Sequence, residues 1–268
     1  MTEGPAAPEP DQGQVTLQAE GSVALIALDR PAKLNGFSRA MLTGLAEAYT
    51  EFERDERYRV AVLHGVGDNF TAGLELDKVV GQMGDEDFWP AECVDPLARR
   101  PPLRAKPVVT AVQGYCFTIG IELMLAGDIG IAAESTQFSQ LEVGRGVMAT
   151  GGATIRMVQR AGWGNAMAHL LTGDRFSAME ALRCGFVQEI VPDGEQLDRA
   201  LKIARVIADQ APLAVRATLA NARKAVHQGP DAAMAEFRQV QARLLASEDA
   251  TEGVASFTER RQARFSGR

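Results

Sequence analysis

The sequence predicts an α/β fold that continues into a helical C-terminal region. Short apolar segments bounded by turn residues alternate with segments of helical period as far as about residue 190, a pattern typical of parallel strands joined by helices. Beyond about residue 195 only the helical period remains. No linker-like stretch separates the two parts, so we expect a single unit with an α/β core at 14–195 and a helical region at 196–268.

The first predicted elements are a hairpin and a helix. Residues 15–31, VTLQAEGSVALIALDRP, indicate two short strands around Glu20 and Gly21. Ser38 then precedes residues 39–55, whose apolar positions recur at helical spacing. Serine is a favoured N-cap residue, so we expect this helix to begin just after Ser38.

Three apolar segments are predicted as buried strands of a parallel sheet, at 59–67, 108–112 and 128–133. Further along the chain, three segments are each predicted to form one amphipathic helix, at 197–210, 213–226 and 232–246. Turn signals separate these helices at Ala211-Pro212 and Gly229-Pro230.

An internal repeat links two parts of the core. FTAGLEL at 70–76 and FTIGIEL at 117–123 match at five of seven positions. Both follow a predicted strand, and both are predicted to open a helix, although chance similarity between two Gly/Leu-rich helix starts stays open. The first N–H groups of a helix lack partners and attract negative charge. Two such ends that converge on one oxygen would form an oxyanion hole.

Charge and composition exclude several classes of protein. The 28 Lys and Arg residues against 35 Asp and Glu residues give a net charge of −7, which argues against general nucleic-acid binding. No apolar stretch reaches the roughly 18 to 20 residues of a membrane span. Residues 1–13 are acidic and rich in Pro and Gly, so we expect a disordered tail and no signal peptide.

The cysteines and histidines carry no local motif. The three cysteines lack a CxxC spacing and are odd in number, which favours a reduced, cytoplasmic location. His64, His169 and His227 are far apart in the sequence. We therefore expect no metal site.

Two glutamates are candidates for acid and base chemistry. Glu122 lies inside the apolar run 114–127, where burying an ionised carboxylate costs several kcal/mol unless it is paired. Glu142 follows twenty residues later in a mostly uncharged stretch. Two carboxylates that face one pocket can divide acid and base roles. Glu75 holds the same position in the repeat as Glu122, and the local pattern ranks neither; a helix-dipole role for Glu122 and a loop position for Glu142 also stay open.

Several motifs in a fixed order resemble the crotonase (enoyl-CoA hydratase/isomerase) superfamily. They are LDRPAKLNGFS, FTAGLEL, VQGYCFTIGIELMLAGDIGIA, FSQLEVGRGV, the long segment from GGATIRMVQ to FVQEIVP, and EGVASFTERRQARF. The resemblance covers nearly the whole chain. It implies a superhelix of repeated β-β-α turns and the binding of a coenzyme A thioester.

The resemblance also implies roles for individual residues. Glu122 and Glu142 match the two catalytic glutamates of the hydratases in this family. The backbone N–H groups of Leu74 and Ile119 match the two donors of the oxyanion hole. Glu75 matches a position outside the chemistry. The implied reaction is reversible hydration of an enoyl-CoA double bond to give a 3-hydroxyacyl-CoA.

The implied coenzyme A site uses five residues. The backbone of Ala72 would meet the adenine, and Lys33 and Leu34 would line the path of the coenzyme. Phe257 and Arg260 match positions that close over the coenzyme arm, often from a neighbouring subunit. Judged without the resemblance, these side chains have ordinary surface or core roles. Coenzyme A would be part of the substrate, with no permanently bound cofactor, and the assembly would be a homotrimer or a dimer of trimers.

The chain departs from the family pattern at two places. Thr118 and Ile119 stand where the family has glycines, and Ala149 and Thr150 stand where it has a Pro-Gly pair. The first change predicts a reshaped acyl pocket, and the second predicts a shifted position of the loop that orients the water. Enoyl-CoA isomerisation, acyl-CoA hydrolysis and acyl-CoA binding with little catalysis therefore stay open as alternatives.

A basic cluster precedes the strand at 108–112. Arg99, Arg100, Arg104 and Lys106 lie within eight residues of one another. They could meet the phosphates of coenzyme A, but we expect a solvated loop, the more common setting for such charges.

Overall fold

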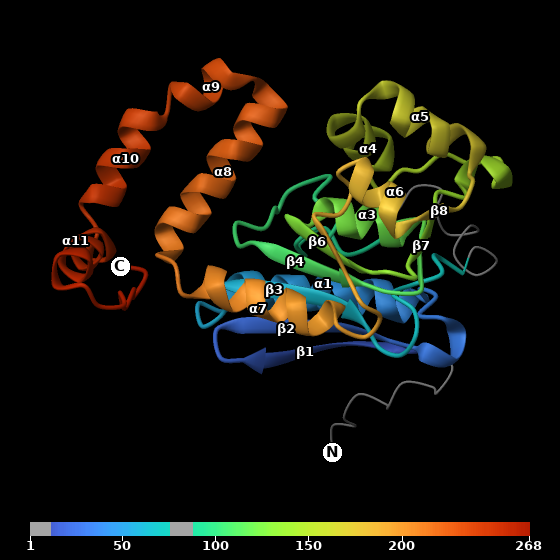
Figure 1. Cartoon of the computed structure of the whole chain (residues 1–268), viewed down its shortest axis with the longest axis horizontal. Coiled ribbons are helices and arrows are strands. Elements are labelled where there is room, and N and C mark those ends of the chain that lie inside the picture. Colours follow the sequence, from blue (N-terminus) through green and yellow to red (C-terminus); the bar gives the residue numbers. More distant parts are fainter. Residues whose placement is uncertain (1–11, 76–87) are drawn as a thin grey trace.

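The computed structural model describes residues 12–75 and 88–268 (Figure 1). Strands β1 (Gln14–Glu20) and β2 (Val23–Asp29) pair antiparallel and form the predicted hairpin. Gly21 occupies its turn with a φ of +59°, a conformation that glycine adopts without a steric penalty. The predicted tail at 1–13 lies outside the described residues, except for its last two positions.

A six-stranded sheet forms the centre of the molecule, in the order β1-β2-β3-β4-β6-β9. All neighbours from β2 onward are parallel, as the alternation of strands and helices predicts. The added strands are β3 (Val60–Gly65), β4 (Val108–Val112), β6 (Ile129–Ala133) and β9 (Glu189–Val191).

Helix α1 (Arg39–Arg54) begins where the sequence predicts. The Ser38 side chain accepts a hydrogen bond of 3.2 Å from the Met41 N–H, which satisfies one of the first unpaired amides of the helix. Tyr49 and Phe52, on the buried face of α1, belong to a core cluster that also holds residues of β2, β3 and β4. The helix therefore covers one face of the sheet.

Helix α7 (Gln196–Ala208) covers the other face. Val60 and Val62 of β3 share a second core cluster with Ala200 and Ala204 of α7, whereas the alternate β3 residues belong to the first cluster. A strand with both faces covered is apolar at successive positions, which explains the continuous apolar run in the sequence. Helix α7 lies beyond residue 195 in the chain and yet packs on the sheet of the core. The division of the chain at residue 195 therefore stays a prediction.

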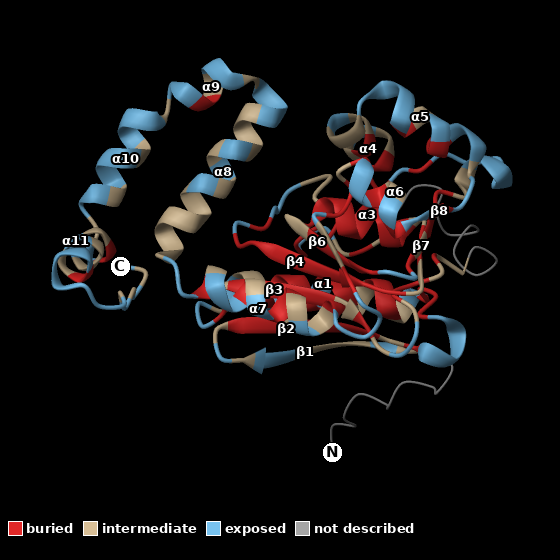
Figure 2. Cartoon of the chain, in the orientation of Figure 1, coloured by how far each residue is buried: buried red, intermediate tan, exposed pale blue. Residues whose placement is uncertain are grey.

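A second, three-stranded sheet carries the segments nearest the candidate site. It pairs β5 (Tyr115–Phe117), β7 (Gln137–Ser139) and β8 (Phe176–Ser177). Helix α3 (Ile119–Ala126) begins directly after β5, and all eight of its residues are buried (Figure 2). The short 3-10 helix η3 (Glu142–Arg145) follows β7. A second such helix, η1 (Pro31–Lys33), follows β2.

Three helices lie between β7 and β9 along the chain. They are α4 (Ala153–Ala161), α5 (Trp163–Thr172) and α6 (Ala178–Arg183). Helix α4 contacts α3, and α5 contacts η3. These contacts tie the two segments that carry Glu122 and Glu142 to one group of helices.

The last helices extend away from this body (Figure 1), in the order α8 (Pro212–Gln228), α9 (Pro230–Met234), α10 (Phe237–Leu245) and α11 (Glu248–Glu259). The prediction of one helix over 232–246 is wrong, because the chain breaks between α9 and α10. The Asn221 side chain of α8 donates a 2.9 Å hydrogen bond to the Ala233 carbonyl, which in a continuous helix would accept from Phe237 four residues on.

The expectation of a solvated basic loop is wrong for two of its four residues. Arg104 is buried and pairs with Asp128 at 2.7 Å. Lys106 is fully buried, and its Nζ donates to the carbonyls of Phe52 and Asp55 at 2.9 and 2.8 Å. These carbonyls lie at the end of α1, where free carbonyl groups attract a cation.

No helix among the described residues has the length and apolar character needed to cross a membrane. The three cysteines, Cys93, Cys116 and Cys184, are free and buried. No disulfide therefore links the elements that these cysteines occupy.

Candidate active site

The two copies of the internal repeat lie side by side. The Thr71 N–H donates to the Tyr115 carbonyl at 2.8 Å, and the Phe117 N–H donates to the Thr71 carbonyl at 3.1 Å. Residues 70–75 form no helix and pair only through isolated β-bridges, unlike the helix start of the second copy. The helix predicted to follow the first copy lies outside the described residues. The two copies of the repeat are therefore neighbours in the fold, but their backbone conformations differ.

The first copy places the Leu74 amide at the edge of a cavity. The Phe37 N–H donates to the Gly73 carbonyl at 2.8 Å, which fixes the chain just before Leu74. Gly73 has a φ of +107°, a value that side-chain-bearing residues rarely adopt. Within the described part of the chain, the Leu74 N–H donates to no acceptor.

The second copy places the Ile119 amide at the first position of α3. Its neighbour Thr118 has a φ of +48° and a ψ of −113°, and the Thr118 N–H is held by the Ser139 carbonyl at 2.9 Å. The Ile119 N–H has no acceptor among the described residues, as expected for the first turn of a helix. The Leu74 and Ile119 amides, from two different segments, are thus each available to a ligand.

One cavity of about 550 Å³ receives both segments. Six sequence-predicted positions line it together: Ala72, Leu74, Thr118, Ile119, Glu122 and Glu142. Apolar side chains that the sequence reasoning missed, among them Phe88, Val147 and Met148, also line it. Met148 is 66% exposed although it is large and apolar. In the sequence, only the position of Met148 shortly after Glu142 indicates that it belongs to the site.

Glu122 is buried on α3 beside the start of α4. Its Oε1 accepts a 3.3 Å hydrogen bond from the Ala153 N–H. Burial raises the pKa of Glu122 to about 7, and the charge of Glu142 adds to this effect. A Cβ at Gly151 would come within 2.2 Å of the Glu122 Oε2, so only glycine allows this backbone to approach the carboxylate.

Glu142 opens η3 on the other side of the cavity. Burial raises its pKa above the ordinary value. Its Oε2 is buried and has no hydrogen-bond partner among the described residues. An unsatisfied buried carboxylate oxygen is costly, so this atom is available to a bound water or substrate. Two carboxyl groups with raised pKa values in one cavity can divide the roles of proton acceptor and proton donor between them.

The proposed coenzyme positions fall into two groups. The Ala72 N–H donates to the Leu34 carbonyl at 3.0 Å, so Leu34 and the adjacent exposed Lys33 lie behind a residue that lines the cavity, although neither lines it directly. Phe257 is 86% exposed on α11, and Arg260 ends that helix. Figure 1 shows α11 at one end of the molecule, well away from α3 in the main body. One chain therefore does not bring Phe257 and Arg260 to the glutamates.

The two departures from the family pattern differ in their placement. Thr118, Ile119 and Thr150 all line the cavity, whereas Ala149 is buried. A Cβ added at Gly73 would lie 2.5 Å from the Thr118 Oγ1, so the threonine hydroxyl fills the space above that glycine. Thr118, Ile119 and Thr150 therefore form part of the same cavity wall as Leu74.

Comparisons with known proteins identify relatives over almost the whole chain. The model of the family described as enoyl-CoA hydratase/isomerase matches residues 18–268. An enoyl-CoA hydratase of Mycobacterium tuberculosis is 30% identical over 256 residues, which cover 94% of this chain and 96% of the relative. A carnitinyl-CoA dehydratase of Proteus mirabilis is 34% identical over 258 residues, covering 94% of this chain and 98% of the relative.

Solved structures of the same fold agree with these relatives. The crystal structure of a probable enoyl-CoA hydratase/isomerase from Mycobacterium abscessus is 48% identical, covers 95% of this chain and 99% of its own, and superposes with a TM-score of 0.92. That of an enoyl-CoA hydratase from Mycobacterium tuberculosis is 32% identical with a TM-score of 0.84, covering 97% of this chain and 100% of its own. The predicted fold class is confirmed.

Proposed function

Because the chain belongs to the enoyl-CoA hydratase/isomerase family, we propose that it adds water reversibly to an enoyl-CoA thioester and forms a 3-hydroxyacyl-CoA. The observation that carries this proposal is the meeting of Glu122 and Glu142 with two unpaired amides in one cavity. Both carboxyl groups have raised pKa values. Hydration needs a proton removed from water and a proton delivered to carbon, so it needs groups that exchange protons near neutral pH.

The Leu74 and Ile119 amides take the role of the oxyanion hole. The thioester carbonyl oxygen accepts a hydrogen bond from each, and both bonds strengthen as negative charge develops on that oxygen. Their position on two held segments supports this role, since preorganised donors do not reorganise during the reaction. Loss of one such donor typically raises the barrier by about 3–4 kcal/mol.

Glu122 and Glu142 hold the water at the β-carbon of the substrate. One carboxylate takes a proton from the attacking water, and a proton reaches the α-carbon from the pair. The partnerless Oε2 of Glu142 supports a water site on that side. The pKa of Glu122, about 7, supports proton exchange in both directions of a reversible reaction.

Coenzyme A enters as part of the substrate, and the chain needs no permanently bound cofactor. The Ala72 backbone meets the adenine, while Lys33 and Leu34 line the coenzyme path. Phe257 and Arg260 close over the coenzyme from a neighbouring subunit of a homotrimer or a dimer of trimers. The exposure of Phe257, 86% in the single chain, supports a partner surface there.

The protein acts in the cytoplasm. Three free cysteines and no disulfide among them support a reducing compartment. The acidic balance of the chain supports a small-molecule substrate and gives no indication of nucleic-acid binding.

A panel of enoyl-CoA thioesters of varied length and branching, with products identified by mass spectrometry, tests the reaction. We expect a 3-hydroxyacyl-CoA. A shifted double bond without added water would indicate an isomerase, and released coenzyme A would indicate a hydrolase. Calorimetric binding of acyl-CoA without turnover on any member of the panel would leave only a binding role. Each of these three results contradicts the hydratase proposal.

Two variants test the site, with a third as a matched control. Glu122→Gln and Glu142→Gln should each lower hydration by at least about 10²-fold, the usual contribution of a positioned acid or base, with acyl-CoA binding kept. Glu75→Gln changes the equivalent glutamate of the first repeat copy, which pairs with Arg30 at 3.2 Å, and should keep its activity. Full activity in both test variants would overturn the assignment.

A further inference from the structure

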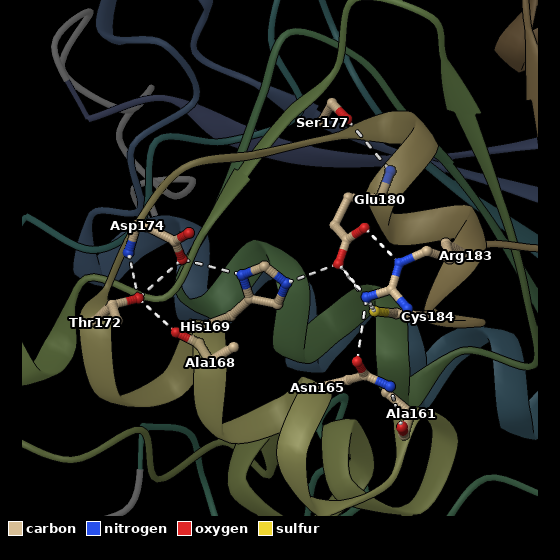
Figure 3. Close-up of polar contacts among 10 residues, drawn as sticks. All are labelled: Ala161, Asn165, Ala168, His169, Thr172, Asp174, Ser177, Glu180, Arg183 and Cys184. Atoms are coloured by element: carbon tan, nitrogen blue, oxygen red, sulfur yellow. Dashed lines mark hydrogen bonds and ion pairs between the residues drawn. The ribbon is translucent and has the colours of Figure 1, made fainter.

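A second cluster of reactive side chains lies on helices α5 and α6, outside the cavity. It brings together His169 of α5, Glu180 of α6 and Cys184, which follows α6 (Figure 3). One ligand atom from each residue lies within 4.8 Å of the other two. His169 and Cys184 are buried, with 6% and 3% exposure. Cys184 lies fifteen positions after His169, so the sequence shows no local motif.

Asp174 fixes the orientation of the His169 ring. Its Oδ1 lies 3.0 Å from His169 Nδ1, and an ionised carboxylate can only accept a hydrogen bond. Nδ1 therefore carries the proton and donates it. The same pairing, in which a carboxylate holds the far nitrogen of a histidine, orients histidines that bind metals through their other nitrogen.

The other side of the ring then presents two electron-rich atoms to each other. His169 Nε2 faces Glu180 Oε1 at 3.4 Å, with Asp174 and Glu180 on opposite sides of the imidazole (Figure 3). A cation next to Glu180 Oε1 relieves the repulsion between them, and three can do so: the Arg183 guanidinium, whose Nη2 lies 2.6 Å from that oxygen, a second proton on the ring, or a metal ion. A proton shared by an imidazolium and a carboxylate would draw them to about 2.7–2.9 Å, so 3.4 Å is long for that arrangement.

The spacing suits tetrahedral coordination. Zinc bonds of about 2.0–2.1 Å to nitrogen or oxygen and about 2.3 Å to sulfur place neighbouring ligand atoms about 3.3–3.6 Å apart. The Nε2 to Oε1 distance is 3.4 Å, and the Oε1 to Cys184 Sγ distance is 3.5 Å. Two edges of the ligand set thus have the length that a zinc ion would impose.

We propose that His169, Glu180 and Cys184 bind one Zn²⁺ ion, with Asp174 as a positioning residue and the fourth position open to water. This departs from the expectation of no metal, which rested on local sequence motifs alone. A Cys thiolate and a Glu carboxylate together neutralise the charge of the ion, and neutral imidazole adds the third bond. The thiol proton of Cys184 leaves to solvent as the sulfur–zinc bond forms.

Arg183 supplies a cation to the site in the absence of metal. Its Nη2 lies 2.6 Å from Glu180 Oε1 and 3.6 Å from Cys184 Sγ. The side chain is 57% exposed, so it can leave toward solvent when the ion enters. Arginine and metal therefore compete for the same carboxylate.

Metal-binding measurements on the full chain test the proposal. After treatment with a chelator, the protein is titrated with Zn²⁺ alone and with Co²⁺ alone. We expect one ion per chain, a higher midpoint of thermal unfolding with Zn²⁺, and a thiolate-to-Co²⁺ charge-transfer band. Cys184→Ser and His169→Gln should lose the band, whereas Cys93→Ser, another buried free cysteine, should keep it.

Two further variants give results that a purely structural cluster would not. Asp174→Asn should weaken Zn²⁺ binding by about 10–100-fold. Arg183→Ala should tighten Zn²⁺ binding by at least about tenfold, because the competing cation is gone. Since this position is exposed, the variant tests the proposal even if Cys184→Ser does not fold. Absence of stoichiometric binding, a charge-transfer band that survives in Cys184→Ser, or weaker binding in Arg183→Ala would overturn the proposal.

Discussion

Glu122 is held in the folded chain with a pKa of about 7, against 4.5 for an ordinary glutamate, chiefly because it is buried. Between these two values the folded state binds more protons than the unfolded state. The free energy of unfolding therefore falls as pH rises from 4.5 to 7, and the penalty is complete above pH 7. The burial of Glu122 in the candidate site thus destabilises the fold at neutral pH.

Glu122→Gln removes this titration and should stabilise the protein more at pH 8 than at pH 5. The expected growth of the stability difference over this range is about 2–3 kcal/mol. Urea unfolding of both proteins at the two pH values measures it. A stability difference that stays constant or shrinks with rising pH would contradict the raised pKa.

Thr118, in the cavity wall, has a strained backbone conformation. Its φ of +48° and ψ of −113° lie in a region that β-branched residues avoid, with a penalty on the order of 1–3 kcal/mol. Thr118→Gly should therefore raise the free energy of unfolding by about 1–2 kcal/mol. Denaturant unfolding measures this change.

The control for that variant is Thr218→Gly in the exposed part of helix α8. Its helical backbone carries no such strain, so glycine there should destabilise the chain by a few tenths of a kcal/mol. If both glycine variants lost stability alike, the strained conformation at Thr118 would be refuted.

At the scale of elements, Lys106 links the start of strand β4 to the end of helix α1. Its Nζ satisfies the Phe52 and Asp55 carbonyls, and burial lowers its pKa. Lys106→Met would leave both acceptors without this donor, so the free energy of unfolding should drop by about 1–3 kcal/mol. Lys202→Met, at an exposed position of α7, is the matched control, and equal stability of the two variants would show that the buried contacts contribute nothing.

Elements with a strong local signal were predictable from the sequence. The hairpin, the three buried parallel strands and the Ser38 cap all follow from short-range pattern, and the structure confirms them. The break between α9 and α10 was not predictable, because no Gly or Pro marks it in the sequence and the Asn221 contact at that point comes from another helix. The burial of Lys106 could not be predicted from the local sequence either, because its hydrogen-bond partners lie about fifty residues earlier in the chain.

The candidate site was predictable only through the resemblance to a family. Local pattern could not rank Glu75 against Glu122, whereas the fold places Glu122 and Glu142 in one cavity. Phe88 and Met148 gave little signal, because a lone apolar residue does not reveal which surface it faces. The His169 and Cys184 pair was invisible in sequence, since the fold alone brings these residues together.

At the scale of the whole molecule, the terminal helices present apolar side chains to solvent. Val254 is 70% exposed and Phe257 86% exposed on α11, and Leu245 is 66% exposed on α10; Figure 2 shows how little of this arm is buried. A monomer with such a surface is prone to association. Three or six chains of 28.8 kDa are the assemblies we propose.

Phe257→Asp places a charge in that surface and should shift the assembly toward monomers, together with weaker acyl-CoA binding. Phe257→Leu keeps the surface apolar and should keep the assembly. Light scattering coupled to size-exclusion chromatography measures both masses. A wild-type monomer, or an Asp variant with unchanged mass, would contradict the proposed role of α11.

Water addition by the pair of glutamates is tested most directly by oxygen labelling. Incubation of the enzyme with an enoyl-CoA in ¹⁸O-water, followed by mass spectrometry, reports whether solvent oxygen enters the product. We predict one ¹⁸O in the 3-hydroxyacyl-CoA formed by the wild type and by Glu75→Gln, and at least about 10²-fold slower labelling in Glu122→Gln and Glu142→Gln. Unlabelled product, or undiminished labelling in both glutamine variants, would contradict it.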